Sequence, residues 1–183
     1  MLPIDASKIR IETDRLILRP FAERDLSDLN EYAKVPGVGE MAGWAAHRSM
    51  EESRAALDRF IRERKTLALE LKENGKVIGS LGLEHCSARP TWKFWKKGRE
   101  VGYSMSKDYW GRGLMPEAVK ALMAYCFEIL GYDYLTCSHF GYNTQSRRVA
   151  EKCGFQFWKE SYFDTRFGTR EQTRCYVCYN PNK

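Results

Sequence analysis

The segment that most constrains this chain is Trp110-Gly111-Arg112-Gly113-Leu114-Met115-Pro116. It lies between a predicted strand over residues 100–106 and a predicted helix over residues 117–130, whose apolar residues recur at helical spacing. The two glycines allow the backbone to approach a ligand closely, and a helix start carries unpaired N–H groups and partial positive charge. The segment therefore predicts a pyrophosphate cradle or, equally, a tight strand-to-helix turn without a ligand.

Two better-known phosphate motifs are excluded at this turn. A dinucleotide fingerprint would need a third glycine at position 116, which is Pro116. A Walker loop would need Gly-Lys-Ser or Gly-Lys-Thr, and neither follows Gly113. The turn thus needs support from elsewhere in the chain before a ligand can be assigned.

The rest of the chain alternates strand and helix patterns. Asn74-Gly75 joins two strands and can take the positive φ angles of a tight turn, and Ser49 and Glu52 have capping-box spacing. Strands are predicted over 15–20, 67–71, 77–83, 134–140, 155–163 and 172–179, and helices over 25–33, 49–64 and 143–154. This order predicts an α+β or α/β fold with one sheet layer flanked by helices, in a single domain spanning residues 1–183.

Composition narrows the class of protein. The 183 residues, 43% of them hydrophobic, suffice for one substantial core. No stretch approaches the ~18 apolar residues of a membrane span, and the N-terminus has no apolar signal region, so we expect a cytoplasmic protein with reduced cysteines and no membrane partner. Cys175 and Cys178 form a CxxC motif on a predicted strand, where they would face opposite sides, and no second pair completes a zinc site; we expect no metal.

The net charge of +6 leaves two interpretations open. Scattered surface Lys and Arg side chains account for it, and so would an anionic partner such as nucleic acid. The one dense patch of positive charge is Lys93 to Arg99. The basic aromatic loop over residues 89–97, which overlaps it, could stack on a base or could be a hairpin connection with exposed side chains. We do not expect nucleic acid as the partner.

A second segment supports a ligand at the glycine turn. Asn143-Thr144-Gln145-Ser146 opens a helix, for which Asn143 is a suitable N-cap, and Lys152-Cys153-Gly154-Phe155 closes it. Together with the turn at 110–115, these motifs resemble the GCN5-related N-acetyltransferase (GNAT) superfamily. Thr13 to Pro20 and Glu100-Val101-Gly102-Tyr103 resemble its ribosomal-protein N-terminal acetyltransferase branch. The resemblance runs from about Glu12 to about Tyr179.

The resemblance implies a mixed, mostly antiparallel sheet splayed between the strands at 100–106 and 134–140, with acetyl-CoA in the gap. It implies backbone contacts to the pyrophosphate and the pantetheine arm, and a side-chain contact near the thioester. The residues concerned are Gly111, Arg112, Gly113, Leu114 and Met115 for the pyrophosphate, Met105 and Ser106 for the pantetheine amides, and Asn143 and Ser146 near the thioester. Trp110 and Met115 depart from the usual first and last residues of the turn motif, which leaves backbone contacts intact.

The expected reaction is direct attack of a primary amine, either a peptide N-terminus or a small amine, on acetyl-CoA in a ternary complex. A protonated amine cannot attack, so a base is needed. Glu100 is the leading candidate, although a structural carboxylate paired with an arginine is an equal alternative; Asp164 and Tyr162 are further candidates. Ser146 is the expected donor to the leaving sulfur. A non-catalytic acyl-CoA-binding module is the alternative function, and a homodimer is left open.

Overall fold

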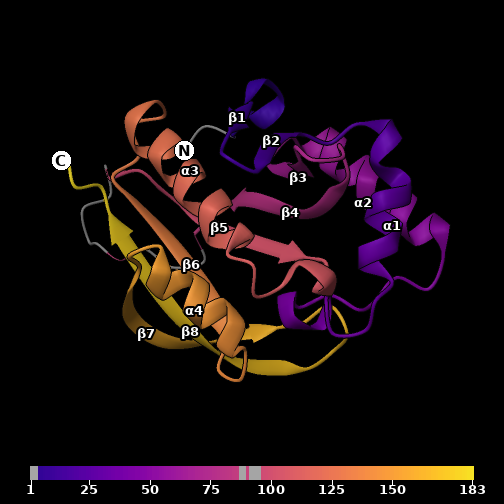
Figure 1. The fold of residues 1–183 in the computed structure, drawn as a ribbon. Coiled ribbons are helices and arrows are strands. Elements are labelled where there is room, and N and C mark those ends of the chain that lie inside the picture. Colours follow the sequence, from indigo (N-terminus) through magenta and orange to yellow (C-terminus); the bar gives the residue numbers. More distant parts are fainter. Residues whose placement is uncertain (1–3, 87–89, 91–95) are drawn as a thin grey trace.

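The structure, a computed structural model, describes residues 4–86, 90 and 96–183. Within these residues eight strands form one sheet in the order β1-β2-β3-β4-β5-β6-β8-β7 (Figure 1). All neighbouring strands are antiparallel except β5 and β6, which are parallel. The strands are β1 (Ile11–Glu12), β2 (Leu16–Pro20), β3 (Thr66–Leu71), β4 (Val77–Glu84), β5 (Gly98–Met105), β6 (Tyr134–Phe140), β7 (Gln156–Asp164) and β8 (Arg170–Tyr179).

Helices cover both faces of this sheet. The helices are α1 (Leu26–Ala33), α2 (Met50–Glu63), α3 (Leu114–Glu128) and α4 (Thr144–Lys152), with short 3-10 turns η1 (Ala6–Lys8), η2 (Glu23–Asp25), η3 (Glu40–Ala42) and η4 (Lys107–Tyr109). Ala68 of β3 packs in a buried cluster with Leu29 and Leu57 of α1 and α2, whereas Leu69 packs in another with Leu122 of α3. Successive strand residues face opposite sides, so the apolar run of β3 fills two cores. The expected three-layer fold class is confirmed.

Two local expectations were wrong in detail. The helix expected from Glu117 begins at Leu114, because Pro116 sits in the first turn, where its missing N–H has no helical partner to lose. In the hairpin between β3 and β4 only Gly75 takes a positive φ, of 73°. The Asn74 side chain instead accepts a hydrogen bond from the Lys76 N–H at 3.0 Å, which stabilises a longer turn.

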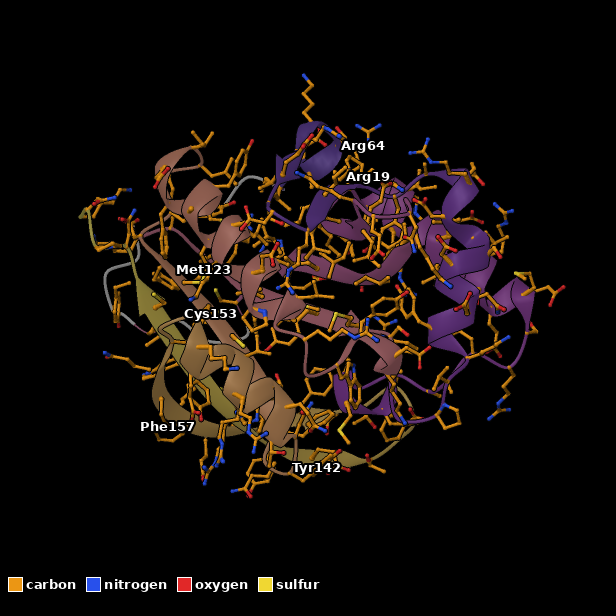
Figure 2. The ribbon with its side chains drawn as sticks, viewed as in Figure 1. Arg19, Arg64, Met123, Tyr142, Cys153 and Phe157 are labelled. Atoms are coloured by element: carbon orange, nitrogen blue, oxygen red, sulfur yellow. The ribbon has the colours of Figure 1, made fainter. Side chains whose placement is uncertain are left out.

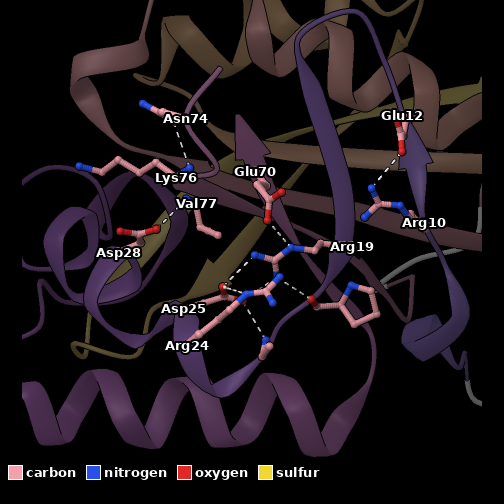
Figure 3. A network of polar contacts seen from close by, with 12 residues as sticks. Arg10, Glu12, Arg19, Arg24, Asp25, Asp28, Glu70, Asn74, Lys76 and Val77 are labelled. Atoms are coloured by element: carbon pink, nitrogen blue, oxygen red, sulfur yellow. Dashed lines mark hydrogen bonds and ion pairs between the residues drawn. The ribbon is translucent and has the colours of Figure 1, made fainter. Parts of the chain in front are cut away.

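A buried ion network fixes α1 against the sheet (Figure 3). The Arg19 guanidinium of β2 donates two hydrogen bonds of 2.8 Å to the Asp25 carboxylate and also pairs with Glu70 of β3. The Asp28 carboxylate accepts a hydrogen bond from the Val77 N–H at 2.8 Å. Arg19 and Asp25 are both almost fully buried, so removing one partner would leave the other charge unpaired in the interior.

The sheet divides where β5 meets β6. The two strands pair over only four positions, from Gly98 with Tyr134 to Val101 with Cys137. Beyond these pairs β5 continues to Met105 and β6 to Phe140 without further pairing between them. The predicted divergence of these two strands therefore lies between residues 102–105 and 138–140.

Candidate active site

A cavity of about 370 Å³ opens at this divergence. Its walls come from the end of β5, the turn before α3, the first turn of α3, the length of α4 and Ser138 of β6. The η3 segment, which lies against both β5 and β6, completes them (Figure 1). The lining residues are Val38, Met41, Ala42, Val101, Gly102, Tyr103, Ser104, Met105, Trp110, Gly111, Gly113, Leu114, Met115, Pro116, Ser138, Asn143, Gln145, Ser146, Arg148, Val149 and Lys152.

The glycine turn forms one end of the cavity. Gly111 and Gly113 each have φ of 77°, a left-handed conformation that favours glycine. A side chain at Gly111 would meet no heavy atom within 4 Å, so the backbone here borders open space. No side chain caps the start of α3, which leaves its first N–H groups available to an anion. Of the five residues expected at this turn, Arg112 alone does not line the cavity; its guanidinium lies over the Tyr109 ring, 5.1 Å from the centroid.

Glu117 ties this turn to the N-terminal segment. Its carboxylate accepts hydrogen bonds from the Thr13 hydroxyl at 2.6 Å and from the Arg15 N–H at 3.0 Å, and it pairs with the Arg15 guanidinium. Arg15 also donates to the Arg112 carbonyl at 3.0 Å. Partial burial raises the pKa of Glu117, but the hydrogen bonds from Thr13 and Arg15 outweigh this effect and lower it overall.

The end of β5 presents backbone groups to the gap. The Ser106 N–H donates to the Ile78 carbonyl of β4 at 2.8 Å, and backbone groups of alternate residues point to the same side. Ser104 and Gly102 therefore face β4, while Tyr103 and Met105 face the gap. The Met105 carbonyl accepts a hydrogen bond from the Trp110 indole at 2.8 Å, and Ser106 does not line the cavity. The gap-facing N–H groups are thus those of Tyr103 and Met105.

Asn143 joins the two sides of the cavity. As the N-cap of α4, its side-chain oxygen accepts a hydrogen bond from the Ser146 N–H at 3.0 Å. Its amide nitrogen donates to the Met41 carbonyl at 3.1 Å. The side chain therefore holds the η3 segment against the start of α4, on the opposite side of the gap.

Two hydroxyl groups of the cavity lining meet each other. The Tyr103 hydroxyl of β5 lies 2.8 Å from the Ser146 hydroxyl of α4. Ser146, the expected donor to the leaving sulfur, is buried and lines the cavity. The two side chains connect strand and helix across the region where the sheet has opened.

Cations border the same end of the cavity as the glycine turn. Arg148 and Lys152 lie one turn apart on α4, and both line the cavity. The end of α4, where Figure 2 labels Cys153, also contacts the start of α3. The Cys153 thiol donates a hydrogen bond of 3.6 Å to the Pro116 carbonyl. The two helices therefore bring a pair of positive charges near the uncapped N-terminus of α3.

The expected base candidates lie outside this cavity. Glu100 stands in the paired part of β5, opposite Glu84 of β4 and Thr136 of β6, and does not line the cavity. Asp164 ends β7 with 83% of its side chain exposed, 3.9 Å from Arg170. Tyr162 is also exposed, and its ring lies under the Arg170 guanidinium. Around the cavity the structure brings together Ser146 and the residues expected to contact the cofactor, except Ser106 and Arg112, but not these three base candidates.

The cysteine side chains lie mostly in the core. Burial raises the pKa of Cys137 and Cys126 to about 12, which makes both poor nucleophiles. In the described part of the chain, no group of three or more His, Cys, Asp or Glu side chains is placed to hold a metal ion. Most of the basic aromatic loop at 89–97 lies outside the described residues. Among the helices of residues 4–86, 90 and 96–183, none combines the length and apolar character of a bilayer crossing.

Several residues of the cavity were not predicted as site residues. Tyr103 and Lys152 were quoted only as parts of motifs, and Met41 and Arg148 were not singled out. Spacing offered a signal for Arg148 and Lys152, since residues four apart share one face of a helix. Met41 had no such signal, because its contact with Asn143 spans 102 residues of chain.

Comparison with known proteins identifies related chains. Residues 15–156 match the model of the acetyltransferase (GNAT) domain family. The uncharacterized N-acetyltransferase YoaA of Bacillus subtilis (strain 168) is 27% identical over 154 residues, covering 80% of this chain and 82% of that protein. The uncharacterized N-acetyltransferase p20 of Bacillus licheniformis is 26% identical over 154 residues, covering 79% and 80%.

Solved structures share the fold at low sequence identity. A GCN5-related N-acetyltransferase from Brucella melitensis superposes with a TM-score of 0.82 at 20% identity, covering 98% of this chain and 81% of that one. The ribosomal-protein-S5-alanine acetyltransferase from Vibrio fischeri superposes with a TM-score of 0.71 at 18% identity, covering 96% and 98%.

Proposed function

Since the chain belongs to the GNAT family of N-acetyltransferases, whose members use acetyl-CoA, we propose that it transfers the acetyl group to a primary amine by direct attack in a ternary complex. The acceptor is a peptide N-terminus or a small amine. The observation that carries the proposal is the cavity between β5 and β6, which is lined by an uncapped helix start and by Ser146.

The phosphate end of acetyl-CoA belongs at the glycine turn. The backbone N–H groups of residues 111–115 would hold the pyrophosphate, because a helix N-terminus attracts anions and no side chain caps this one. Arg148 and Lys152 add two positive charges from α4. The open space beside Gly111 supports this fit, since a phosphate can approach the backbone there without a side chain in the way.

The pantetheine arm belongs along the end of β5. Its amides would pair with the gap-facing backbone groups of Tyr103 and Met105, as an added strand pairs with a sheet edge. This arrangement directs the thioester toward Ser146. Asn143 helps by holding the start of α4 and the η3 segment in place, rather than through a free amide group of its own.

The chemical step needs an amine without its proton and a sulfur that can leave. We place Glu100 ahead of Asp164 as the base, because Asp164 is largely exposed and Glu100 stands on the strand that leads into the cavity. Glu100 would act through water, since it does not line the cavity. Ser146 would donate a hydrogen bond to the sulfur. Transfer would be direct, because burial raises the pKa of the Cys137 thiol to about 12.

The test combines binding and turnover. Acetyl-CoA at about 100 times its dissociation constant should add about 2.7 kcal/mol to the free energy of unfolding. Gly113→Asp should abolish that shift, because a carboxylate would stand where phosphate must approach and the φ of 77° would be strained. Gly168→Asp, at an exposed turn with φ of 87°, is the matched control for backbone strain.

Turnover is measured as free CoA released from acetyl-CoA over a panel of small amines and N-terminal peptides. An unchanged affinity for acetyl-CoA in a folded Gly113→Asp variant would refute the placement of the pyrophosphate. Tight binding of acetyl-CoA by the wild type, with no transfer to any acceptor on the panel, would instead identify a non-catalytic acyl-CoA-binding module.

A further inference from the structure

Tyr103 contributes a hydroxyl group to the cavity for which the proposed reaction has so far given no role. Its ring packs against the main core cluster, and its side chain lines the cavity. The hydroxyl lies 2.8 Å from Ser146 Oγ, 3.2 Å from the Ser146 carbonyl oxygen and 3.9 Å from Cys137 Sγ. Two of these contacts are therefore with helix α4, and the third is with strand β6.

The contact with Ser146 Oγ is the shorter of its two oxygen contacts, at the usual distance for a bond between hydroxyl groups. Burial raises the pKa of Tyr103 well above its ordinary value, so the phenol keeps its proton and remains a donor throughout the working pH range. Either hydroxyl can donate in this contact, and the Ser146 carbonyl is a second acceptor for the single Tyr103 hydrogen. When Tyr103 donates to Ser146 Oγ, the hydrogen of the serine hydroxyl cannot point back at the tyrosine and can point into the cavity that Ser146 lines.

We propose that Tyr103 is a positioning residue that turns the Ser146 hydroxyl toward the leaving sulfur of acetyl-CoA. This inference rests on the proposed function, because it assumes that the thioester lies beside Ser146. It goes further, because it states that Tyr103 of β5 controls the orientation of the Ser146 hydroxyl of α4. Ser146 touches the sulfur, and Tyr103 acts through Ser146.

The bonds and protons that move during acetyl transfer show what the Ser146 hydroxyl contributes. The amine nitrogen forms a bond to the acetyl carbon, the carbon–sulfur bond breaks, and its electron pair stays on sulfur. The amine loses its proton to the base and then to solvent, and CoA leaves as a thiolate. A thiol has a pKa near ~8.5, so the sulfur gains little from full protonation by a hydroxyl group of much higher pKa. The Ser146 hydroxyl therefore stabilises the thiolate by a hydrogen bond and keeps its own proton.

The first test measures the pKa of the thiol of bound CoA and does not require turnover. In the complex of the protein with CoA, a donated hydrogen bond from Ser146 should lower the pKa of the CoA thiol, measured by the ultraviolet absorbance of the thiolate across a pH titration. Tyr103→Phe removes only the hydroxyl and keeps the ring in the core. We expect it to raise the pKa of the bound thiol by about one unit, a tenfold loss of thiolate stabilisation, with CoA affinity nearly unchanged.

The second test uses kinetics and a double variant. Tyr103→Phe should lower kcat about tenfold, while the KM for acetyl-CoA stays close to that of the wild type. Because Tyr103 acts through Ser146, the variant carrying both Tyr103→Phe and Ser146→Ala should be no slower than Ser146→Ala alone. Tyr125→Phe is the matched control, since Tyr125 packs against the same core cluster and does not line the cavity.

The outcomes separate this inference from the proposed function. A bound CoA thiol whose pKa is the same in the wild type and in Tyr103→Phe overturns it, as does a double variant whose losses multiply. If no amine on the panel is acetylated, the proposed function fails, and the titration of bound CoA still decides the role of Tyr103. A Tyr103→Phe variant that binds CoA weakly would show a role in packing only, which also overturns it.

Discussion

Both charged side chains that line the cavity in the described part of the chain, Arg148 and Lys152, are cations. They suit the phosphate groups of a cosubstrate, but they cannot take a proton from an incoming ammonium group. The nearest carboxylate along the lining strand is that of Glu100, which shares one face of β5 with Gly102 and Ser104, because alternate strand residues point the same way. Both of those residues line the cavity.

Glu100→Gln should therefore slow acetyl transfer by about 10²-fold or more and leave acetyl-CoA affinity nearly unchanged. The glutamine keeps the shape of the side chain and removes its charge. The loss should shrink as pH rises, because more of the acceptor amine is already neutral. The measurement is a pair of pH–rate profiles with one good acceptor.

Glu84→Gln is the matched control for this experiment. Glu84 stands opposite Glu100 in the register of β4 and β5, and its carboxylate pairs with Lys65 at 2.7 Å. We expect this variant to keep the wild-type profile. If Asp164→Asn slowed transfer more than Glu100→Gln did, the base would lie at the end of β7 and the assignment to Glu100 would be wrong.

At the scale of elements, the start of α3 depends on a distant segment of the chain. Its first-turn residue Glu117 binds Thr13 and Arg15, which precede β2, and Arg15 reaches back to the carbonyl of Arg112 in the glycine turn. A carboxylate is favourable in the first turn of a helix, where the dipole is positive. These contacts of Glu117 and Arg15, called the clamp below, thus hold the glycine turn in place. They leave the first N–H groups of α3 available to a ligand.

Glu117 gives this clamp a dependence on pH. Because the pKa of Glu117 is lowered below its usual value of 4.5, its contribution to stability is present above about that pH and is lost as the pH falls through the folded-state pKa. Glu117→Gln should lower the melting temperature at neutral pH, and the difference from the wild type should disappear in acid. Thermal melts across pH 3–7 measure this.

Glu128→Gln provides the comparison on the same helix. Glu128 is the last residue of α3 and is exposed, so its removal should shift the melting temperature little. A Glu117→Gln variant as stable as the wild type at neutral pH would show that the clamp adds nothing. Weaker acetyl-CoA binding in Glu117→Gln, and not in Glu128→Gln, would connect the clamp to the glycine turn.

Elements with regular periodicity were predicted well from the sequence. The strand at 134–140 has the predicted bounds, and Asn143 caps α4 as expected, because both depend on residues that are close in the chain. The start of α3 was placed three residues late, since Pro116 suggested a boundary that the first turn of a helix tolerates. The contacts of the cavity walls were beyond prediction, because Tyr103 and Ser146, or Met41 and Asn143, meet only through the tertiary fold.

At the scale of the whole molecule, the cavity lies at the boundary between β5 and β6, called the seam below, where one sheet divides into two parts. Strands β1 to β5 carry α1 and α2 on one side of it, and β6 to β8 follow on the other (Figure 1). The strands across the seam pair over four positions only. At the open end two contacts replace strand pairing: Asn143 donates to the Met41 carbonyl at 3.1 Å, and the Arg166 N–H donates to the Gly43 carbonyl at 3.0 Å.

Asn143 allows the seam to be tested separately from the helix that it caps. Asn143→Asp keeps an oxygen that can accept the Ser146 N–H, so α4 should retain its cap, but a carboxylate cannot donate to the Met41 carbonyl and would repel it. Asn143→Ala loses both bonds, and loss of an N-cap alone costs about 0.5–2 kcal/mol. We therefore expect the melting temperature to fall clearly in Asn143→Ala and less in Asn143→Asp.

Both variants should loosen the cavity where Met41 meets the start of α4. Backbone amides of residues 38–44, which include η3, should exchange hydrogen faster in Asn143→Asp and in Asn143→Ala than in the wild type. The reason is that the hydrogen bond that holds Met41 is gone in each variant. Since Val38, Met41 and Ala42 of this segment line the cavity and are not among the residues proposed to hold acetyl-CoA, KM for the amine acceptor should rise in both, with acetyl-CoA affinity changed less. If Asn143→Asp left exchange at residues 38–44 unchanged, the side chain would act only as a helix cap, and other contacts would hold the seam, among them the Arg166–Gly43 bond, the Tyr103–Ser146 contact and the paired part of β5 and β6.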